Sequence, residues 1–312
     1  MNSYLKRFSG TLIAFVIFAV LLASVLLFDK EKKSEENLEK VFPGLKTEEI
    51  TSIAFKSAGS EFTLERSGAD WIVASGSNEY KADNGAIEDL IQDLSEMEVV
   101  KLVSKETDKL EEYGIVESET EFSFHAKGAE FPVIIGDKSP VGSGIYIYDL
   151  GEGRVLIVND QYLWGFLNKT PGDFRERKLL GINKEGITRI SVKVGDFSAE
   201  LAQKDGKWFV TVKGDDRIAD QKKVGDILDS FSGLKAEGFE DDEPEDPEKY
   251  GLVQPTAEIV FYGEGPEEGV VFGKRKDEAS YFVRVSGAAP VYSVSKNYFK
   301  ILPKNGEDLI SR

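Results

Sequence analysis

One block of sequence occurs twice in the chain, and its two copies lie 137 positions apart, as in Ile50 and Ile187. A repeat at one fixed spacing requires two copies of a single structural unit, and each copy is about as long as an ordinary domain. The chain is therefore predicted to fold as two tandem units of the same kind. The matched pairs are Ile50 and Ile187, Thr51 and Thr188, Ile53 and Ile190, Leu64 and Leu201, Trp71 and Trp208, Val73 and Val210, Ala82 and Ala219, and Asp83 and Asp220.

Each copy is predicted to form strands, then one helix, then further strands. The run from Ile50 to Phe55 alternates apolar and polar residues, which is typical of a half-buried strand. Residues 86–97 and 224–234 instead carry apolar residues at helical spacing, in the same pattern in both copies. This order predicts an α+β fold, with antiparallel sheet and amphipathic helices in each unit, rather than alternating βαβ.

Four segments follow from this pattern and from the charge distribution. Residues 1–28 are expected to be a cytoplasmic tail and transmembrane anchor, and residues 29–42 a charged stalk. The first α+β repeat is placed at 43–180 and the second at 181–312.

The anchor prediction depends on residues 10–28, which carry no charge and are mostly Leu, Val, Ile, Phe and Ala. At about 1.5 Å per residue a helix of this length matches the hydrocarbon core of a bilayer. The small pair Ala23-Ser24 lies inside the apolar run, which favours an uncleaved anchor over a signal peptide. Basic residues flank both ends, so charge alone leaves the orientation open. Large domains translocate regardless of local charge, and we expect a single-pass protein of the inner membrane with its soluble part outside the cytoplasm.

Composition excludes several classes of function. The net charge of −17 lacks the basic face that nucleic-acid binding needs. The chain has no cysteine, which excludes disulfides, thiolate nucleophiles and zinc–cysteine sites.

The residues able to do chemistry all have simpler structural interpretations. His125 is the only histidine and is expected on the solvent face of a strand. Asp83 and Asp220 each precede a predicted helix, where a carboxylate accepts backbone N–H bonds. Trp71 and Trp208 are expected in the cores. No enzymatic activity, catalytic residue, cofactor site or metal site is predicted; a hydrolase would need two carboxyls facing each other across a cleft.

Two further segments are given structural roles. The steps Tyr113-Gly114 and Tyr250-Gly251 are each expected to close a short helical turn, with the glycine in the left-handed conformation. The acidic run 240–248 contains two prolines and repels itself, and is predicted to be an extended, solvated loop.

These elements, taken in order, resemble the bacterial domain of unknown function 4340. The matching features are the turns before Trp71 and Trp208, the Ala-Asp pairs that open a helix, the Tyr-Gly steps, the Gly136 and Gly273 strands, Tyr281–Arg284 and Asp173–Arg175. No arginine in the first copy corresponds to Arg284. The resemblance covers everything after the stalk, in two copies. It implies a single N-terminal membrane helix and proximity to envelope ABC transporters, and it carries over no catalytic residue.

The expected function is therefore interaction rather than catalysis. We expect a membrane-anchored extracytoplasmic scaffold or accessory subunit of an envelope ABC transport system, in contact with the bilayer through residues 10–28. The alternative is a binding module that holds an extracytoplasmic glycan or lipid in a cleft between the repeats.

Overall fold

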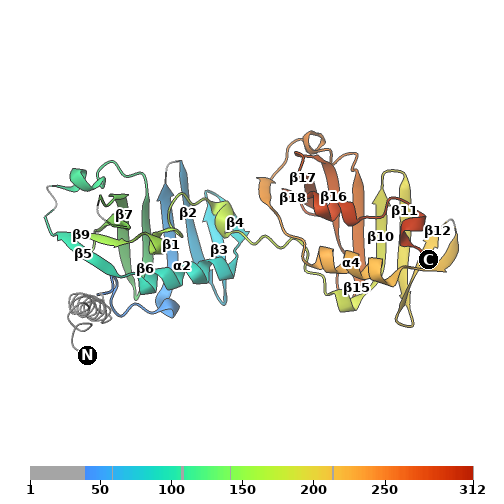
Figure 1. Ribbon diagram of the computed structural model, residues 1–312, viewed down its shortest axis with the longest axis horizontal. Helices are drawn as coiled ribbons and strands as arrows, with labels where there is room; N and C mark the ends of the chain where they lie inside the picture. The colour runs from blue at the N-terminus through green and yellow to red at the C-terminus, as the bar shows by residue number, and fades with distance from the viewer. Residues whose placement is uncertain (1–38, 58, 107–108, 141, 213, 312) are drawn as a thin grey trace, which may run out of the picture. The chain divides into compact units, whose positions relative to one another are not determined.

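The computed structural model describes residues 39–57, 59–106, 109–140, 142–212 and 214–311 (Figure 1). The predicted anchor, residues 10–28, lies outside this part of the chain, as does the predicted stalk up to residue 38. Among the described residues, no helix combines the length and the apolar character that crossing a membrane requires.

The first sheet has nine strands in the order β4-β3-β2-β1-β6-β7-β8-β9-β5. Neighbouring strands pair antiparallel, as in β1 with β6, where Phe55 lies opposite Phe122. The strands are β1 (Ile50–Ser57), β2 (Ser60–Ser67), β3 (Asp70–Ser75), β4 (Asn78–Lys81), β5 (Val99–Ser104), β6 (Glu121–Ala126), β7 (Ala129–Lys138), β8 (Gly144–Asp149) and β9 (Arg154–Asn159).

The second sheet repeats this arrangement strand for strand, in the order β13-β12-β11-β10-β15-β16-β17-β18-β14. The register repeats too: Ile53 pairs with Leu64 in the first sheet, and Ile190 with Leu201 in the second. Its strands are β10 (Ile187–Val194), β11 (Phe197–Lys204), β12 (Lys207–Val212), β13 (Asp215–Ile218), β14 (Gly238–Asp241), β15 (Ala257–Gly263), β16 (Glu268–Arg275), β17 (Ser280–Val285) and β18 (Val291–Ser295).

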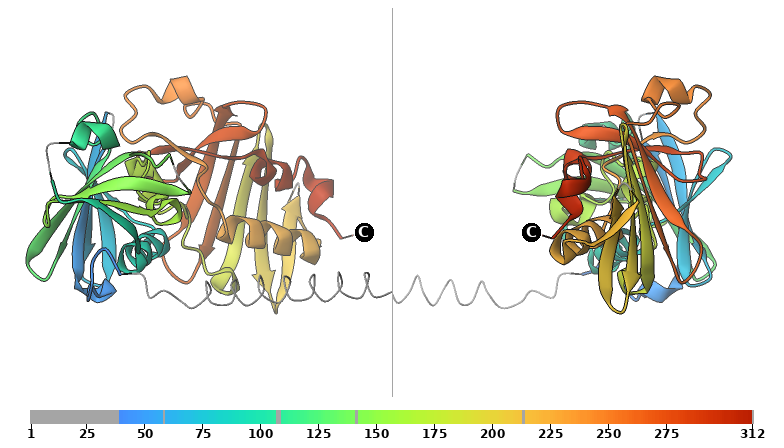
Figure 2. Two further views of the ribbon diagram at one scale, coloured as in Figure 1. Left: turned by 60° about the vertical axis from the view of Figure 1, so that its left-hand side comes forward. Right: turned by 90° about the vertical axis from the view of Figure 1, so that its right-hand side faces the viewer.

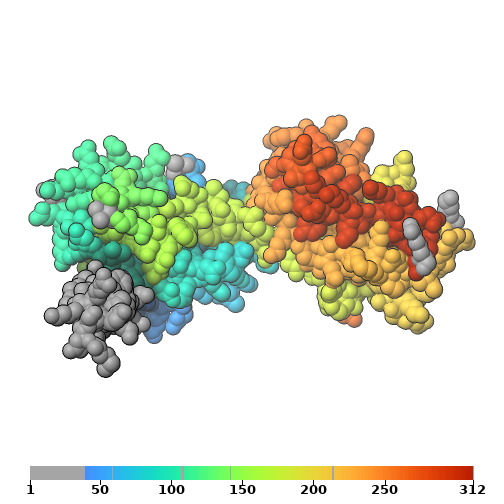
Figure 3. Space-filling view, in the orientation of Figure 1, coloured from blue at the N-terminus to red at the C-terminus, as the bar shows by residue number. Residues whose placement is uncertain are grey.

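Few helices accompany the sheets. The predicted helices over 86–97 and 224–234 correspond to α2 (Asn84–Glu96) and α4 (Gln221–Ser232), each lying across one face of its sheet (Figures 1 and 2). The space-filling view shows the C-terminal residues, in red, at the surface of the second repeat (Figure 3). The remaining elements are α3 (Pro171–Phe174), α5 (Lys296–Ile301), and the 3-10 turns η1 (Thr47–Glu49), η2 (Leu110–Tyr113), η3 (Asp160–Leu163), η4 (Lys184–Gly186), η5 (Pro247–Tyr250) and η6 (Gly306–Leu309).

The described chain is thus mostly β, and the expected α+β class overstates its helical content. Two units of antiparallel sheet are present, as predicted. The additional β content comes from β4, β5, β13 and β14, the strands at the sheet edges. Three of these four edge strands are rich in charged residues, which hide the alternating apolar pattern that identifies a half-buried strand.

Each sheet is covered on both faces, as the second one shows. Its main core lies under α4 and contains Phe231, Phe261 and Phe272. A smaller cluster on the opposite face joins Tyr250 and Leu252 to Val291, with Val271 and Phe282 packed against it. The Tyr-Gly segment therefore closes the second face of the sheet.

A glycine makes this closure possible in both repeats. A Cβ atom on Gly273 would lie 2.1 Å from the carbonyl oxygen of Tyr250, and one on Gly136 would lie 2.3 Å from that of Tyr113. The neighbouring atom is backbone in each case, so the strand accepts only glycine at this close approach.

The chain divides into two compact units, whose limits differ from those of the sequence repeats. One unit contains Met1–Arg66 and Ala86–Lys169, and the other contains Ser67–Gly85 and Thr170–Arg312. The second unit thus includes β3 and β4 of the first sheet. The repeat boundary at 180/181 is drawn from sequence periodicity and stays a prediction.

Candidate functional site

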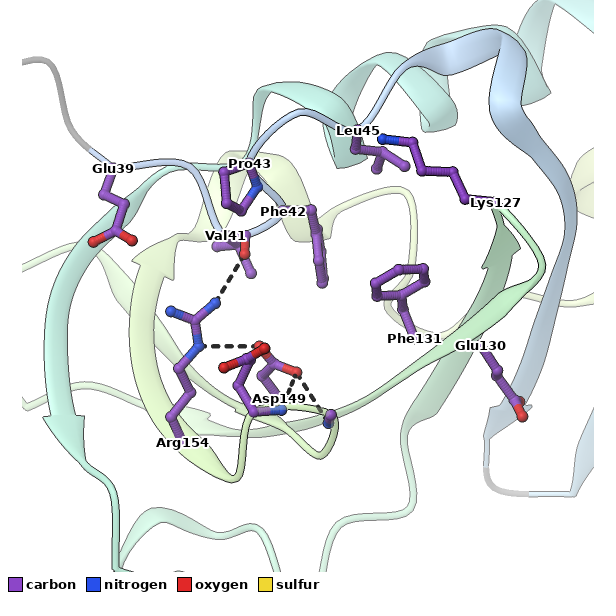
Figure 4. Close-up of a pocket in the computed structure, with 12 residues that line it drawn as sticks. Glu39, Val41, Phe42, Pro43, Leu45, Lys127, Glu130, Phe131, Asp149 and Arg154 are labelled. Atoms are coloured by element: carbon purple, nitrogen blue, oxygen red, sulfur yellow. Dashed lines mark hydrogen bonds and ion pairs between the residues drawn. The ribbon is translucent and has the colours of Figure 1, made fainter.

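A pocket of about 510 Å³ opens in the first unit, where the chain enters the first sheet (Figure 4). One wall is the entry segment, which runs from Glu39 to Leu45 ahead of β1. The opposite wall comes from the β6–β7 and β8–β9 hairpins. The lining residues are Glu39, Val41, Phe42, Pro43, Leu45, Lys127, Glu130, Phe131, Asp149, Gly151, Glu152 and Arg154.

The floor of the pocket is aromatic. The Phe42 and Phe131 rings lie 6.1 Å apart, edge to face, and both pack against Phe124 with centroid distances of 4.9 Å. Phe42 and Phe124 are buried, while Phe131 is half-buried and faces the cavity (Figure 4). This triple contact holds the rings in fixed positions, so the apolar surface is formed before any ligand arrives.

A buried ion pair braces the wall. Arg154 donates from Nε to Asp149 Oδ2 at 3.0 Å and from Nη2 to the carbonyl oxygen of Val41 at 2.9 Å. Asp149 Oδ1 accepts from the backbone N–H groups of Gly151 and Glu152, at 3.1 and 3.3 Å. The carboxylate thus shapes the β8–β9 turn while the guanidinium ties the entry segment to it.

Some charged residues at the rim of the pocket have an ion-pair partner and others do not. Lys127 pairs with Glu49 at 3.1 Å and donates to the carbonyl oxygen of Gly44 at 2.8 Å. Desolvation opposes ionisation of the Glu49 carboxyl, but the hydrogen bonds from Lys127 and from the Lys46 backbone N–H, with the charges of both lysines, outweigh it and lower the pKa of Glu49. Among the described residues Glu39, Glu130 and Glu152 make no ion pair, and all three are exposed.

The second repeat is different at the same place. Leu45 corresponds to Ile182, which is only 8% exposed, and Phe131 corresponds to Glu268. The Glu268 carboxylate reaches back to accept the backbone N–H of Gly181 at 2.5 Å. The entry segment is one residue longer in the first repeat, because Lys40 bridges Glu98 whereas Lys178 bridges the equivalent Lys235.

The ion pair is also specific to the first repeat. In the first sheet Asp149 pairs with Val133. The equivalent pair in the second sheet is Val285 with Val270, so Val285 takes the place of Asp149. The residue of the second repeat that corresponds to Arg154 is Pro290. The brace therefore belongs to the first repeat and to its pocket.

The composition of the pocket resembles that of a binding site. Both Asp149 oxygens accept hydrogen bonds, one set from the β8–β9 turn and one from Arg154, which gives this carboxylate a structural role in the pocket wall. Within the described ranges, no three His, Asp or Glu side chains lie close enough to share a metal ion. An aromatic floor with a polar, partly charged rim is typical of ligand and partner sites.

The residues weighed from the sequence lie elsewhere. His125 is exposed on β6, on the strand face opposite Phe122 and Phe124, and its Nδ1 lies 3.3 Å from Ser52 Oγ. Trp71 and Trp208 are buried in the cores, as predicted. Asp220 caps α4 by accepting the backbone N–H of Lys223 at 3.1 Å, which confirms its predicted role.

Backbone bonds around these residues repeat as well. The backbone N–H of Asp83 donates to Phe174 and that of Asp220 donates to Leu309, at 2.7 and 2.8 Å. The glycines of the Tyr-Gly steps, Gly114 and Gly251, adopt the predicted left-handed conformation with φ of 67° and 72°.

The acidic run 240–248 was predicted to be a solvated loop, and this is correct only for its second half, where Glu243, Glu245, Asp246 and Glu248 are exposed. Its first residues belong to β14 or follow it directly, and their carboxylates have specific partners: Glu240 pairs with Lys276, and Asp241 accepts the Tyr250 hydroxyl at 2.7 Å. Lys276 follows β16 and is distant in sequence, and Tyr250 ends the 3-10 turn η5. Their attraction outweighs the mutual repulsion of the carboxylates and keeps this part of the run on the sheet.

Asp242 has the most elaborate surroundings in the second unit. Arg175 binds it through two hydrogen bonds of 2.6 and 3.0 Å, and Tyr80 donates to it at 2.9 Å. Burial disfavours the ionised carboxyl, but the bonds from Arg175 and Tyr80 and the Arg175 charge outweigh it and lower the pKa of Asp242. Sequence reasoning missed this cluster, because no short spacing links its members.

The comparisons with known proteins give a family and no function. The model of the family described as "Domain of unknown function (DUF4340)" matches residues 71–218 and 208–312. The chain belongs to the DUF4340 family. Both DUF4340 matches begin at a repeat tryptophan, Trp71 or Trp208, so the family model detects the duplication as two tandem segments. No curated protein and no solved structure matches the chain.

Proposed function

We propose that this DUF4340 protein is a membrane-anchored interaction protein whose first repeat binds a partner outside the cytoplasm. The observation that carries the proposal is the preformed pocket of about 510 Å³ in the first unit. The expected partner is a subunit of an envelope ABC transport system, and residues 10–28 serve as a single transmembrane helix in the inner membrane.

The position of the pocket along the chain supports this function. Its wall begins at Glu39, and ten residues separate Glu39 from Phe28, the last residue of the predicted span. Even a fully extended connection of this length reaches only about 40 Å. A pocket so close to the anchor is within reach of the extracytoplasmic parts of a membrane partner.

The make-up of the pocket supports binding to a protein. Partner sites concentrate their binding energy in a few aromatic and arginine side chains that are held in place and surrounded by a polar rim. Phe42 and Phe131 provide the aromatic centre, and Arg154 provides the fixed wall. The exposed Glu39, Glu130 and Glu152 give the rim a negative charge, which favours a partner segment with basic residues.

Photo-crosslinking in native membranes tests the proposal. A benzophenone amino acid is placed at Glu130, on the pocket rim, and separately at Glu267, the exposed equivalent residue of the second repeat. We expect a transporter subunit to be crosslinked from position 130 and not from position 267. Equal recovery from both positions, or no transporter subunit from either, would contradict the proposal.

The alternative ligand, an extracytoplasmic glycan or lipid, is supported by the size of the pocket, since cavities of roughly 300–1,000 Å³ hold small molecules. Native mass spectrometry of the full chain released from membranes tests it. A bound mass that is lost in Phe131→Asp and kept in Glu267→Gln favours a small ligand. An unliganded chain in both cases rejects it.

A further inference from the structure

One tryptophan of the first repeat is held in solvent. Trp164 directly follows the 3-10 turn η3 and is 65% exposed, whereas Trp71 and Trp208 are 2% and 7% exposed in the cores. Its neighbours Leu163 and Phe166 are both buried. The core therefore fixes the chain on either side of Trp164, and the indole is presented to solvent from a fixed backbone. Tryptophan is among the side chains most enriched at the energetic centre of protein interfaces.

The indole lies beside the exposed face of α2. A Cβ atom on Gly165 would lie 2.5 Å from the Leu90 side chain and 4.0 Å from Asp93 Oδ2. Residue 165 thus packs directly on the helix, and Trp164 is joined to it by one peptide bond. A partner that contacts the indole therefore also meets the outer side chains of α2.

This face of α2 is acidic. The helix contains four carboxylates and no basic residue, and within the described ranges none of the four forms an ion pair. Burial and the charges of Asp89 and Glu96 raise the pKa of Asp93. Carboxylates one turn apart on a helix repel each other, so their arrangement does not stabilise the helix. The carboxylates alone define no site, but they select a basic contact for the indole.

The second repeat lacks both features. Lys300 stands at the position of Trp164. Asp226, which corresponds to Asp89, pairs with Lys222 at 2.6 Å, one turn away on α4. The shared fold therefore requires neither an exposed indole nor an unpaired acidic helix face at this place.

The surface around Trp164 and α2 adjoins the pocket. The backbone N–H of Val41 donates to the carbonyl oxygen of Met97 at 2.9 Å, and Lys40 Nζ donates to that of Ser95 at 2.8 Å. Both acceptors lie in the last turn of α2 or directly after it. The entry segment that forms the pocket wall is thus attached to this helix, and one partner can contact both.

Arginine is the side chain whose chemistry matches this surface. Its planar guanidinium stacks on an aromatic face and binds a carboxylate through two parallel hydrogen bonds. The chain itself contains this combination, since Arg175 lies 4.0 Å from the centre of the Phe239 ring and binds Asp242 twice. Trp164 beside Asp93 provides the aromatic and the acidic half of the same contact. An anionic lipid surface, by contrast, would be repelled by the carboxylates of α2.

We propose that Trp164 and the adjoining face of α2 form a second docking surface, which binds an arginine of the partner protein. The guanidinium lies over the indole, and its N–H groups bond to Asp93 or Asp89. This inference rests on the proposed function, because it takes the occupant to be the protein that fills the pocket. Binding of the arginine also relieves the repulsion among the carboxylates of α2.

Photo-crosslinking from position 164 tests the surface in the full-length protein in native membranes. The benzophenone amino acid replaces Trp164, which keeps an aromatic side chain there, and in a matched control it replaces Lys300, the exposed equivalent of the second repeat. We expect about tenfold more crosslinked transporter subunit from position 164 than from position 300. Mass spectrometry of the crosslinked peptide should place an arginine within a few residues of the attachment point.

Removing the charge of the helix tests the chemistry of the contact. Asp89→Asn with Asp93→Asn should lower crosslinking from position 164 severalfold, because it removes the carboxylates that bind the arginine. Asp226→Asn with Asp229→Asn removes the same charge from α4 and should leave the yield unchanged. An equal loss in both double variants would assign the effect to net charge and overturn the proposal.

Equal crosslinking from positions 164 and 300, or a crosslinked segment without arginine, would also overturn the proposal. So would crosslinks only to lipid or to a second copy of the chain. Recovery of the subunit from position 130 but not from position 164 would reject this surface and leave the proposed function standing. Recovery from position 164 alone would reject the pocket as the binding site and keep this surface.

Discussion

The two repeats share a fold but differ in how much of their surface the chain itself covers. In the second repeat, Glu268 bonds to Gly181 beside the buried Ile182, and Arg175 covers Phe239 on the edge strand. In the first repeat, Leu45 lines an open pocket and Leu102 is exposed.

If the first repeat binds a partner, as proposed, this difference marks where the binding function was added to a duplicated scaffold. The paired residues that maintain the fold, such as Trp71 and Trp208 or Gly136 and Gly273, have the same roles in both copies. Among the positions compared above, Leu45 and Ile182, and Phe131 and Glu268, have different roles, and those of the first repeat line its pocket. A duplicated chain thus provides an internal reference, in which one copy shows what the fold alone requires of the other.

The largest expected effect concerns the cores, in which the two repeats are most alike. Phe231 on α4 and Leu94 on α2 occupy the same position in the helix stripe, and both are fully buried. Phe231→Ala should lower the free energy of unfolding by about 4 kcal/mol and Leu94→Ala by about 3 kcal/mol, through lost burial and the cavity left behind. Hydrogen exchange should locate each loss in its own sheet. A loss spread equally over both sheets would show that the repeats do not have separate cores.

The glycines under the Tyr-Gly turns provide a second test of equivalence. Gly136→Ala and Gly273→Ala should each destabilise the protein by about 3 kcal/mol, because the new methyl group meets a backbone carbonyl. Gly225→Ala in α4 is the control: it has open space and should stabilise by about 0.5 kcal/mol. Chemical denaturation measures all three. A neutral result at Gly273 would remove the proposed reason for glycine there.

The Arg175–Asp242 pair should sharpen the contrast between the edges. Arg175→Met should destabilise the second unit by about 2 kcal/mol, because it leaves the half-buried Asp242 carboxylate without its main partner. The folded-state pKa of Asp242 is below its ordinary value of 3.8, so the stability due to ionised Asp242 is present above pH 3.8 and is lost as the pH falls below it. Unfolding between about pH 5 and about pH 2.5 should show this loss in the parent, and a smaller one in Arg175→Met. The same loss of stability with falling pH in the parent and in Arg175→Met would contradict this prediction.

The smallest effect is expected at the lone histidine. His125 corresponds to Tyr262, whose ring lies 3.8 Å from the Arg189 guanidinium. His125→Tyr places the residue of the second repeat on an exposed strand face, and should change the free energy of unfolding by less than about 0.5 kcal/mol. Partner crosslinking from position 130 should be unchanged. A strong loss of crosslinking would show that His125 has a functional role that the exposed position does not explain.

The sequence was sufficient for the parts of the fold that depend on local periodicity. The helix stripes, the buried tryptophans, the left-handed Gly114 and Gly251, and the cap at Asp220 were all predictable, because each depends on residues close together in the chain. The duplication made these predictions stronger, since each pattern occurs twice.

The pocket and the edge strands could not be predicted in this way. The Arg154–Asp149 brace acts by holding Val41, which is over a hundred residues away in sequence. Asp242 looked like one more carboxylate in an acidic run, although Arg175 and Tyr80 hold it in place. Such long-range pairings are fixed by strand order, and strand order cannot be read from the spacing of apolar residues.

The central claim is that equivalent positions are open in the first repeat and closed in the second. The rate of maleimide labelling at Leu45→Cys and Ile182→Cys measures this most directly, since the two residues occupy the same place in the repeat and the chain has no other cysteine. The half-buried, pocket-lining position 45 should react at least tenfold faster than position 182, where the side chain is 8% exposed. Equal rates in the folded full-length protein would contradict the account.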